Sequence, residues 1–449
     1  MIRLNETVTN FIVDTIDDSI EALKKLCRIP SVAAKGEGLE ETAELVEKML
    51  EDAGLETEVH ETSGAPVVTG WIDFGAKRTL LFYNHYDVQP AEPLDLWDSP
   101  PFEPDIRDGR IYGRGVADNK GDTISRIWAL KAFIESGTEI PVNVKCIVEG
   151  EEEIGSLHFP KFVEKNQDFM KADGGIWEFG GEGYDGVQEA WLGLKGIFYV
   201  QLEIETLARD VHSSMGCVLP SAPQRLAEAL SSIKDEEHRI LIDGFYDGIK
   251  PLTEAEWAAI DKIDLREADI KKNYGVDEFL NGMTGRDFKE AYYNAPTCTI
   301  CGLTSGYQGD GSMTVLPAKA SAKIDFRLVE GMNPEDIKKK FRRHFDDGGY
   351  SDIKFLWYEG YPAGKTPIDH PFVDVVRRAN AKVFDDLKVH PTSPGSGPLY
   401  IFKDHVPMVS IGVSDYDSKG HSPNESIKIE NFRKGMLRLV HLIDEMGRW

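Results

Sequence analysis

Five short segments spread over most of the chain carry histidines and carboxylates, which are the side chains that bind zinc and neighbouring divalent metals. In one segment two carboxylates are adjacent, so one could bind a metal ion while its neighbour moves a proton. Together the segments supply every residue that a two-metal hydrolase needs. They are His85–Asp87, Gly113–Asp118, Glu151–Gly155, Glu178 and Gly420–Glu425.

Asp118 lies in a glycine-rich loop, with Gly115 before it and Gly121 after it. Glycines let a loop turn sharply and bring its backbone close to a ligand. The two oxygens of a carboxylate at this position could bridge two cations. A phosphate-binding loop or a plain turn would produce the same pattern, so these alternatives remain open from the loop alone.

An acidic run, Glu151–Glu153, separates an apolar segment from Ile154-Gly155. Like charges packed at the end of a strand repel one another unless a cation offsets them. An exposed acidic turn is the alternative, and the apolar residues that flank the run argue against it. His85 and His421 lie in polar loops, where a histidine without partners is usually a surface residue.

Motifs of the competing enzyme classes are missing from the sequence. Gly395–Gly397 does not fit the G-x-S-x-G pattern of a serine hydrolase. No Walker loop occurs, and Gly113–Gly115 lacks the third glycine of a dinucleotide-binding motif. Metal-dependent hydrolysis therefore remains the favoured chemistry.

Two apolar runs, residues 79–83 and 143–148, are predicted to be buried strands, and residues 122–136 between them have helical spacing. This order is typical of a parallel α/β sheet, in which ligands bind beyond the carboxyl ends of the strands. His85 and the acidic run follow two such ends. Further helices are predicted at 12–26, 39–53 and 429–446, and a strand at 408–413.

The middle of the chain predicts a separate module. Alternating strands are expected at 198–205 and 320–328, and helices at 223–233 and 334–345. This β-α-β order indicates an α+β module inserted into the first domain, with the acidic segment 234–294 as an elaboration of it. The expected divisions are 1–194 and 363–449 for the catalytic domain and 195–362 for the insertion.

Bulk properties exclude several classes of protein. A length of 449 residues predicts two or three domains, and a net charge of −26 disfavours nucleic acid and anionic membranes as partners. No membrane helix is predicted, and the apolar run 11–13 stops at Asp14, so we expect a cytoplasmic protein without a secretory signal. The five cysteines predict no disulfide framework, and Cys298 and Cys301 are interpreted as structural thiols.

Taken in order, the segments resemble the family of carnosinases, glutamate carboxypeptidases, acetylornithine deacetylases and succinyl-diaminopimelate desuccinylases. The resemblance covers nearly the whole chain, and the insertion at 234–294 with Arg327–Val329 is most similar to the carnosinase branch. Each motif is weak alone, but all of them in the family's order are a strong signal. They are Tyr83–Pro90, Trp97 with Pro101-Phe102, Asp108–Gly115, Asp118–Gly121, Glu149–Ser156, Asp210–Ser213, Arg327–Val329 and Gly420-His421.

The resemblance implies two divalent metal ions bridged by Asp118, in an α/β domain whose mixed, mostly parallel sheet is flanked by helices. The other ligands divide into His85 and Glu178 for one ion, and Glu153 and His421 for the other. Asp87 would hold the His85 ring in the right tautomer. The expected metal is zinc, with manganese and cobalt as alternatives. Family members often have a cis peptide after the bridging aspartate, here Asp118–Asn119.

The resemblance also implies a mechanism and an assembly. Glu152 would be the general base that takes a proton from the water shared by the metals and then protonates the leaving amine. His212 resembles the family histidine that reaches the active site of the neighbouring subunit. We therefore expect a homodimer that forms through the inserted lid domain.

Substrate binding is implied for two further parts of the chain. Arg327 resembles the lid arginine that grips a substrate carboxylate, a group that a guanidinium fits well. The family often binds the same carboxylate just before a helix, here predicted near Pro398. The corresponding residues are Gly395, Ser396 and Gly397.

One departure from the carnosinase branch leaves the substrate open. That branch commonly has Asp where this chain has Glu178, whereas Glu is usual among the carboxypeptidases and deacylases; Glu182 is the other candidate for this position. The expected activity is hydrolysis of dipeptides or release of a C-terminal residue from short peptides. The alternatives are deacylation of N-acyl or N-succinyl amino acids, and a catalytically dead relative that binds metal or peptide, against which the intact ligands and Glu152 argue.

Overall fold

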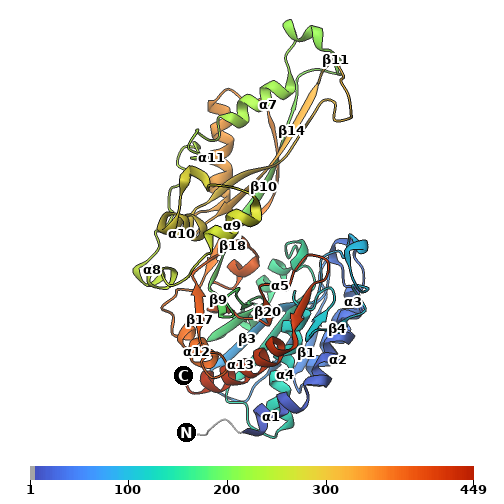
Figure 1. The fold of residues 1–449 in the computed structure, drawn as a ribbon, viewed down its shortest axis with the longest axis vertical. Coiled ribbons are helices and arrows are strands. Elements are labelled where there is room, and N and C mark those ends of the chain that lie inside the picture. The colour runs from blue at the N-terminus through green and yellow to red at the C-terminus, as the bar shows by residue number, and fades with distance from the viewer. Residues whose placement is uncertain (1–5) are drawn as a thin grey trace. The chain divides into compact units, whose positions relative to one another are not determined.

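A computed structural model describes residues 6–449, which divide into two compact units (Figure 1). The first unit contains the described residues up to Gly193 together with Lys365–Pro391 and Gly397–Trp449. The second unit contains Leu194–Gly364 and the short segment Thr392–Ser396. The first unit is therefore built from both ends of the chain, and the second from its middle.

The sheet of the first unit is mixed, as the sequence predicts. Its central strand β3 is parallel to β6 on one side and to β7 on the other, and β7 is parallel to β19. The strand order is β1-β2-β6-β3-β7-β19-β9-β8-β20, with β17 beside β9. Bounds are β1 Glu56–His60, β2 Val67–Ile72, β3 Thr79–His85, β6 Asn143–Glu149, β7 Gly174–Trp177, β8 Gly181–Glu182, β9 Gln188–Trp191, β17 Leu387–His390, β19 Met408–Ser410 and β20 Ser414–Asp415.

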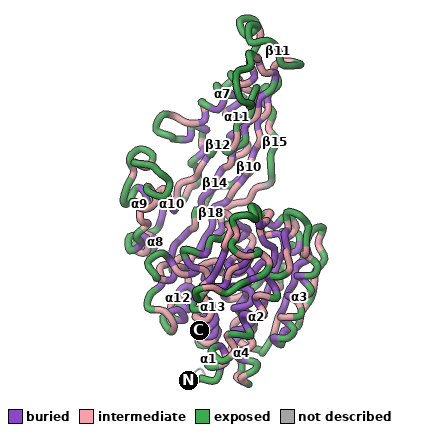
Figure 2. The backbone as a smooth tube through the Cα atoms, turned by 45° about the vertical axis from the view of Figure 1, so that its right-hand side comes forward, coloured by how far each residue is buried: buried purple, intermediate pink, exposed green. Residues whose placement is uncertain are grey.

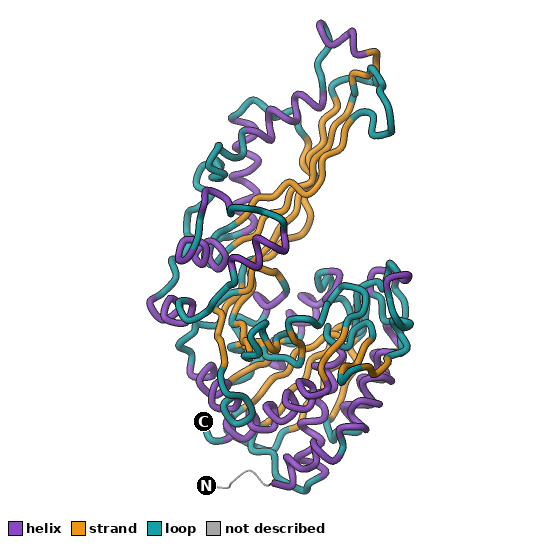
Figure 3. Tube along the Cα trace, viewed as in Figure 1, coloured by secondary structure: helices purple, strands orange, loops and turns teal. Residues whose placement is uncertain are grey.

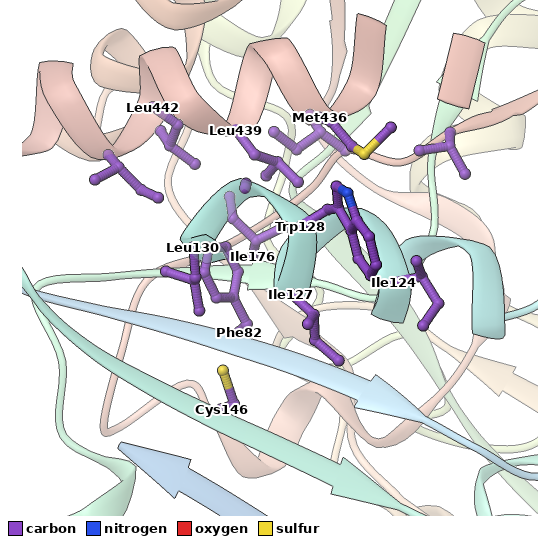
Figure 4. Close-up of a cluster of buried hydrophobic side chains, with 14 of the residues drawn as sticks. Phe82, Ile124, Ile127, Trp128, Leu130, Cys146, Ile176, Met436, Leu439 and Leu442 are labelled. Carbon is purple, nitrogen blue, oxygen red and sulfur yellow. The ribbon is translucent and has the colours of Figure 1, made fainter. Parts of the chain in front are cut away.

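Helix α4 (Lys120–Glu135) is the centre of the core of the first unit. It lies between the sheet and α13 (Ile429–Gly447), and its Ile127 and Trp128 are buried among side chains from both (Figure 4). Phe82 of β3 and Met436 of α13 belong to the same cluster. The other main helices are α1 Glu6–Asp14, α2 Ile16–Cys27, α3 Leu39–Glu51, α5 Phe159–Lys165, α6 Gln167–Met170 and α12 Pro371–Asn380.

Two predicted elements of the first unit differ from the structure. The helix predicted at 12–26 is two helices, because Thr15 has φ −111° and ψ 20° between α1 and α2. The strand predicted at 408–413 ends at Ser410. Beyond it the backbone groups are bound by side chains instead, since Arg438 donates to the Gly412 carbonyl and the Val413 N–H donates to Asp122.

The second unit has the α+β architecture that the sequence predicts. Its antiparallel sheet has the order β12-β14-β10-β15, and helices α7 and α11 lie along one face (Figure 3). Buried residues alternate along β10 and β14 (Figure 2). Phe198 and Phe326 stack on each other, and Phe326 also contacts Phe341 of α11. The bounds are β10 Gly193–Glu205, β12 Thr297–Ser305, β14 Lys319–Leu328, β15 Lys354–Tyr361, β18 Ser393–Ser396, α7 Ala222–Ser231, α8 Glu254–Ile260, α9 Glu267–Tyr274, α10 Gly285–Asn294 and α11 Pro334–Asp347.

All five cysteines are free thiols, which agrees with the expectation of no disulfide framework. Cys298 is buried and Cys301 is exposed, and both belong to β12. None of the helices formed by residues 6–449 has the length and hydropathy needed to span a lipid bilayer.

Candidate metal centre

Parallel pairing of β3 and β6 brings the predicted histidine and the acidic run to one edge of the sheet. His85 is the last residue of β3, and its Cα pairs with that of Glu149 at the end of β6. The chain leaves β6 through Gly150 and Glu151 into a short 3₁₀ helix, Glu152–Ile154. Segments that lie about 65 residues apart in the sequence therefore converge at the carboxyl ends of these strands, where α/β sheets bind ligands.

Asp87 holds both the His85 ring and the acidic run. His85 is fully buried, and its Nδ1 lies 3.1 Å from the Asp87 carbonyl oxygen and 3.3 Å from the Asp87 carboxylate. The two carboxylate oxygens of Asp87 accept the backbone N–H groups of Glu152 at 3.2 Å and Glu153 at 3.0 Å. Contacts at Nδ1 leave the Nε2 of His85 directed at the other site residues, as a metal-ligating histidine requires.

Asp118 faces two histidines, one with each oxygen. Its Oδ1 lies 3.0 Å from His85 Nε2, and its Oδ2 lies 3.0 Å from His421 Nε2. Glu178 Oε2 is 3.7 Å from the same His85 nitrogen, and Glu153 Oε2 is 3.1 Å from the same His421 nitrogen. The structure thus gathers two sets of one histidine and one glutamate around a shared aspartate.

These separations fit metal coordination. Ligands at about 2.05 Å from a tetrahedral zinc ion lie about 3.3 Å from one another, which is within the observed range of 3.0–3.7 Å. Two buried carboxylate oxygens, Glu153 Oε1 and Glu178 Oε2, have no hydrogen-bond partner among the described residues. Buried carboxylate oxygens without donors call for a cation, and the His and carboxylate donors are those that zinc accepts.

The pKa shifts of the site residues also indicate a centre that binds cations. Hydrogen bonds with Asp118 and Glu153 raise the pKa of His421 to about 10. Burial raises the pKa of Glu178 well above its usual range, and the nearby Glu152 carboxylate adds to this. Burial also raises the pKa of Glu152 to about 8; His85 opposes the shift and Glu153 reinforces it. Without metal the centre therefore holds protons that bound cations would displace.

Glu152 lies beside the first set of ligand candidates. One of its oxygens, a His85 nitrogen and a Glu178 oxygen all lie within 4.8 Å of one another. A second such group consists of His85, Asp118 and Glu153. Glu152 is thus close enough to serve either as a proton-transfer group or as an additional ligand.

The other predicted residues lie outside this cluster or in the second unit. Glu182 pairs with Lys428 at 2.6 Å, so Glu178 is the better candidate of the two. His212 is exposed in the second unit, with its Nδ1 2.8 Å from Ser214 Oγ. Arg327, half-buried on β14, donates to Asp325 at 3.2 Å.

The proposed carboxylate-binding segment is divided between the units. Gly395 and Ser396 belong to the second unit and Gly397 to the first. The Ser396 hydroxyl donates to the Gly196 carbonyl at 3.2 Å. The helix expected to begin near Pro398 is a four-residue 3₁₀ helix, Pro398–Ile401.

Some residues that shape the site were not found from the sequence. Arg126, buried inside α4, donates to the carbonyl of Trp177 at 2.8 Å and to Asn84 Oδ1 at 2.6 Å. Asn119 Nδ2 donates to the Glu178 carbonyl at 2.6 Å, and the Asp118–Asn119 bond is cis, as the family resemblance implies. The available signal for Arg126 was a charged residue between the apolar residues Ile124 and Ile127 of a predicted helix.

Comparisons with known proteins agree with this site. The model of peptidase family M20/M25/M40 matches residues 81–445. The chain is 33% identical to human Beta-Ala-His dipeptidase over 83% of this chain and 75% of that protein. It is 28% identical to the Cys-Gly metallodipeptidase of Schizosaccharomyces pombe, over 96% of both chains.

A solved structure with the same fold supports the assignment. It is an M20 family metallo-carboxypeptidase from Sulfolobus solfataricus, which matches with a TM-score of 0.91 and 35% identity over 96% of this chain and 99% of that one. All the histidine and carboxylate segments fall within residues 81–445, the part of the chain that the family model matches. This chain is therefore a metallopeptidase, and it belongs to peptidase family M20/M25/M40.

Proposed function

We propose that this chain hydrolyses the peptide bond of dipeptides at a centre of two divalent metal ions, zinc being the best match to the donor set. The observation that supports this most directly is the position of Asp118, whose two oxygens face His85 and His421 separately. One ion would be held by Asp118 with His85 and Glu178. The other would be held by Asp118 with Glu153 and His421.

The residues of the chain have separable tasks in this reaction. The metal ions would lower the pKa of a water molecule and polarise the substrate carbonyl. Glu152 accepts the proton of the attacking water and returns it to the amide nitrogen as the bond breaks. Burial raises the pKa of Glu152 to about 8 in the metal-free chain. Bound cations would favour the carboxylate form of Glu152, which is the form that accepts a proton from water.

Dipeptides are the proposed substrates because the relatives named for dipeptide cleavage match most of the chain. Release of a C-terminal residue from a longer peptide is the second candidate, favoured by the likeness to a metallo-carboxypeptidase. In either case we propose that Arg327 and the segment Gly395–Gly397 bind the substrate carboxylate. A guanidinium fork and backbone N–H groups are suitable partners for that group.

A substrate panel tests the proposed function. Enzyme reconstituted with zinc, manganese or cobalt is assayed on dipeptides, C-terminally blocked dipeptides, tripeptides and N-acetyl or N-succinyl amino acids. We expect cleavage of free dipeptides, and a loss of activity when the C-terminal carboxylate is amidated. Turnover of acyl amino acids alone would show a deacylase, and no turnover of any compound with any metal would contradict the enzyme proposal.

We further propose that the chain works as a homodimer in which His212 from one subunit completes the active site of the other. This histidine is exposed in the second unit, where its ring nitrogens lie within hydrogen-bond distance of the Ser214 and Thr314 hydroxyls. Mixing inactive Glu152→Gln chains with inactive His212→Ala chains should restore part of the activity, because a mixed dimer has one site with both residues. The measurement is the rate of dipeptide hydrolysis against mixing ratio.

The control for this experiment is each variant mixed with itself under the same refolding or exchange conditions. Mass spectrometry of the intact complexes confirms that mixed dimers form. Failure to recover activity in confirmed mixed dimers would rule out the role of His212 across subunits, and a chain that is always monomeric would rule out the dimer.

A further inference from the structure

Glu425 is a buried carboxylate that the proposed reaction does not use. Its side chain is fully buried, and it lies four positions after the proposed ligand His421. Its two oxygens are both occupied by donors from another part of the chain. Because both oxygens already accept hydrogen bonds, Glu425 is not a metal ligand in this structure, and its buried carboxylate must have another role.

The donors to Glu425 all come from the loop that ends at Asp118. Oε2 accepts from the Arg114 guanidinium at 2.6 Å and from the Gly115 N–H at 3.0 Å. Oε1 accepts from the N–H of Ala117 at 2.9 Å and from the N–H of Asp118 itself at 3.1 Å. One carboxylate therefore fixes the backbone of the loop up to the residue that bridges the two proposed metal sites.

The same residue anchors the loop of His421. The His421 side chain is 54% exposed, whereas Glu425 and Ser426, which end the same loop, are buried. His421 and Asn424 both have φ of 62°, a left-handed conformation that costs energy in a residue with a side chain. Contacts at the end of the loop must hold this shape, and the Glu425 carbonyl also accepts the Gly113 N–H at 3.0 Å.

Stability alone does not explain this pair of charges. Removing an arginine and a glutamate from water costs free energy that their attraction repays poorly, so a buried ion pair contributes little net stability. What it does provide is a fixed geometry, since the guanidinium and the three N–H groups define the position of both carboxylate oxygens. The geometry fixed here is that of Asp118 relative to His421.

We propose that Glu425 is a positioning residue for the metal centre, which locks the Asp118 loop to the His421 loop before metal binds. This inference rests on the proposed two-metal centre. It concerns mainly the ion held by Asp118, Glu153 and His421, because two of those three ligands lie on the loops that Glu425 joins. The other ion keeps His85 and Glu178, whose positions depend on β3 and on the residues that follow β7.

Glu425→Gln tests this role with a change of a single atom. The amide places an NH₂ donor where an acceptor is required, facing either the Arg114 and Gly115 donors or those of Ala117 and Asp118. We expect one of the two metal dissociation constants to rise about 10- to 100-fold, the usual effect of losing a residue that supports a ligand. The dissociation constant of the other metal ion should change by much less.

The readout is a cobalt titration of the metal-free enzyme, followed by visible absorption, which reports the coordination of each equivalent separately from turnover. The matched control is Glu445→Gln, which makes the same change in an ion pair with Arg378 at 2.8 Å, away from the proposed ligands. The control should leave both metal dissociation constants unchanged.

If Glu425→Gln does not fold, Arg114→Lys provides the test, because it keeps the charge but loses the guanidinium contacts to Glu425 and to the Pro90 carbonyl. Arg114→Lys should weaken the binding of the same cobalt equivalent that Glu425→Gln is expected to affect.

The possible failures are distinguishable. If the unmodified enzyme takes up fewer than two equivalents of cobalt, the proposed metal centre itself is wrong. If it takes up two and Glu425→Gln, or Arg114→Lys in its place, binds both with unchanged constants, the centre stands and the positioning role is wrong. Equal weakening in the Glu445→Gln control would also overturn the role, because the effect would then be one of general destabilisation.

Discussion

Glu152→Gln should lower kcat for dipeptide hydrolysis by about 10²- to 10⁴-fold, the range for loss of a general acid-base group. The amide has the same size as the carboxyl group but can neither accept the proton of the attacking water nor return it to the leaving amine. The fold should persist, because the backbone N–H of Glu152, which donates to Asp87, is unchanged. The measurements are kcat, KM and the metal content of the purified variant.

The metal content separates the two roles that the geometry allows for Glu152. If Glu152 only transfers protons, the variant should keep two metal equivalents. If Glu152 is a ligand, the variant should lose metal. The matched control is Glu151→Gln, one position earlier in the same acidic run, where the carboxylate accepts from the His158 N–H at 3.1 Å. Near-normal kcat in Glu152→Gln would remove it as the base, and a loss of metal would make it a ligand.

His421→Ala should reduce the bound metal from about two equivalents per chain to about one. The Nε2 of His421 is 3.0 Å from Asp118 and 3.1 Å from Glu153, and alanine offers no atom in its place. The ion would then keep only Asp118 and Glu153 of its three proposed side-chain ligands, fewer than zinc sites in proteins normally have. Elemental analysis after dialysis against metal-free buffer measures the change, and kcat should fall with it.

The control for this variant is His238→Ala, which removes an exposed histidine of the second unit. It should keep both equivalents and normal turnover. Two full equivalents in His421→Ala would contradict the assignment of His421. Loss of both would mean that the two ions bind only as a pair, which the cobalt titration of the same variant would show as a single weakened step.

Local patterns were enough to predict the strands that carry the site. The apolar runs of β3 and β6 and the helical spacing of α4 are short-range features, and they place His85 and the acidic run at neighbouring strand ends. The ligand assignments came instead from the family resemblance. The structure gathers those residues around Asp118.

The contacts that fix the ligands could not be predicted from local patterns. Asp87 accepts N–H groups 65 and 66 positions away, and Glu425 accepts that of Asp118 from 307 positions away. Nothing in the spacing of residues says which backbone groups a buried carboxylate will meet. The early end of β19 has the same cause, because side chains of α4 and α13 bind the backbone that would otherwise have continued the strand.

Anomalous diffraction from crystals of the zinc-loaded enzyme, recorded at the zinc absorption edge, tests the two-metal centre most directly. We expect two peaks about 3.5–4 Å apart, one on each side of the Asp118 carboxylate, with His85 at one and His421 at the other. A single peak, or peaks that do not share Asp118, would contradict the account.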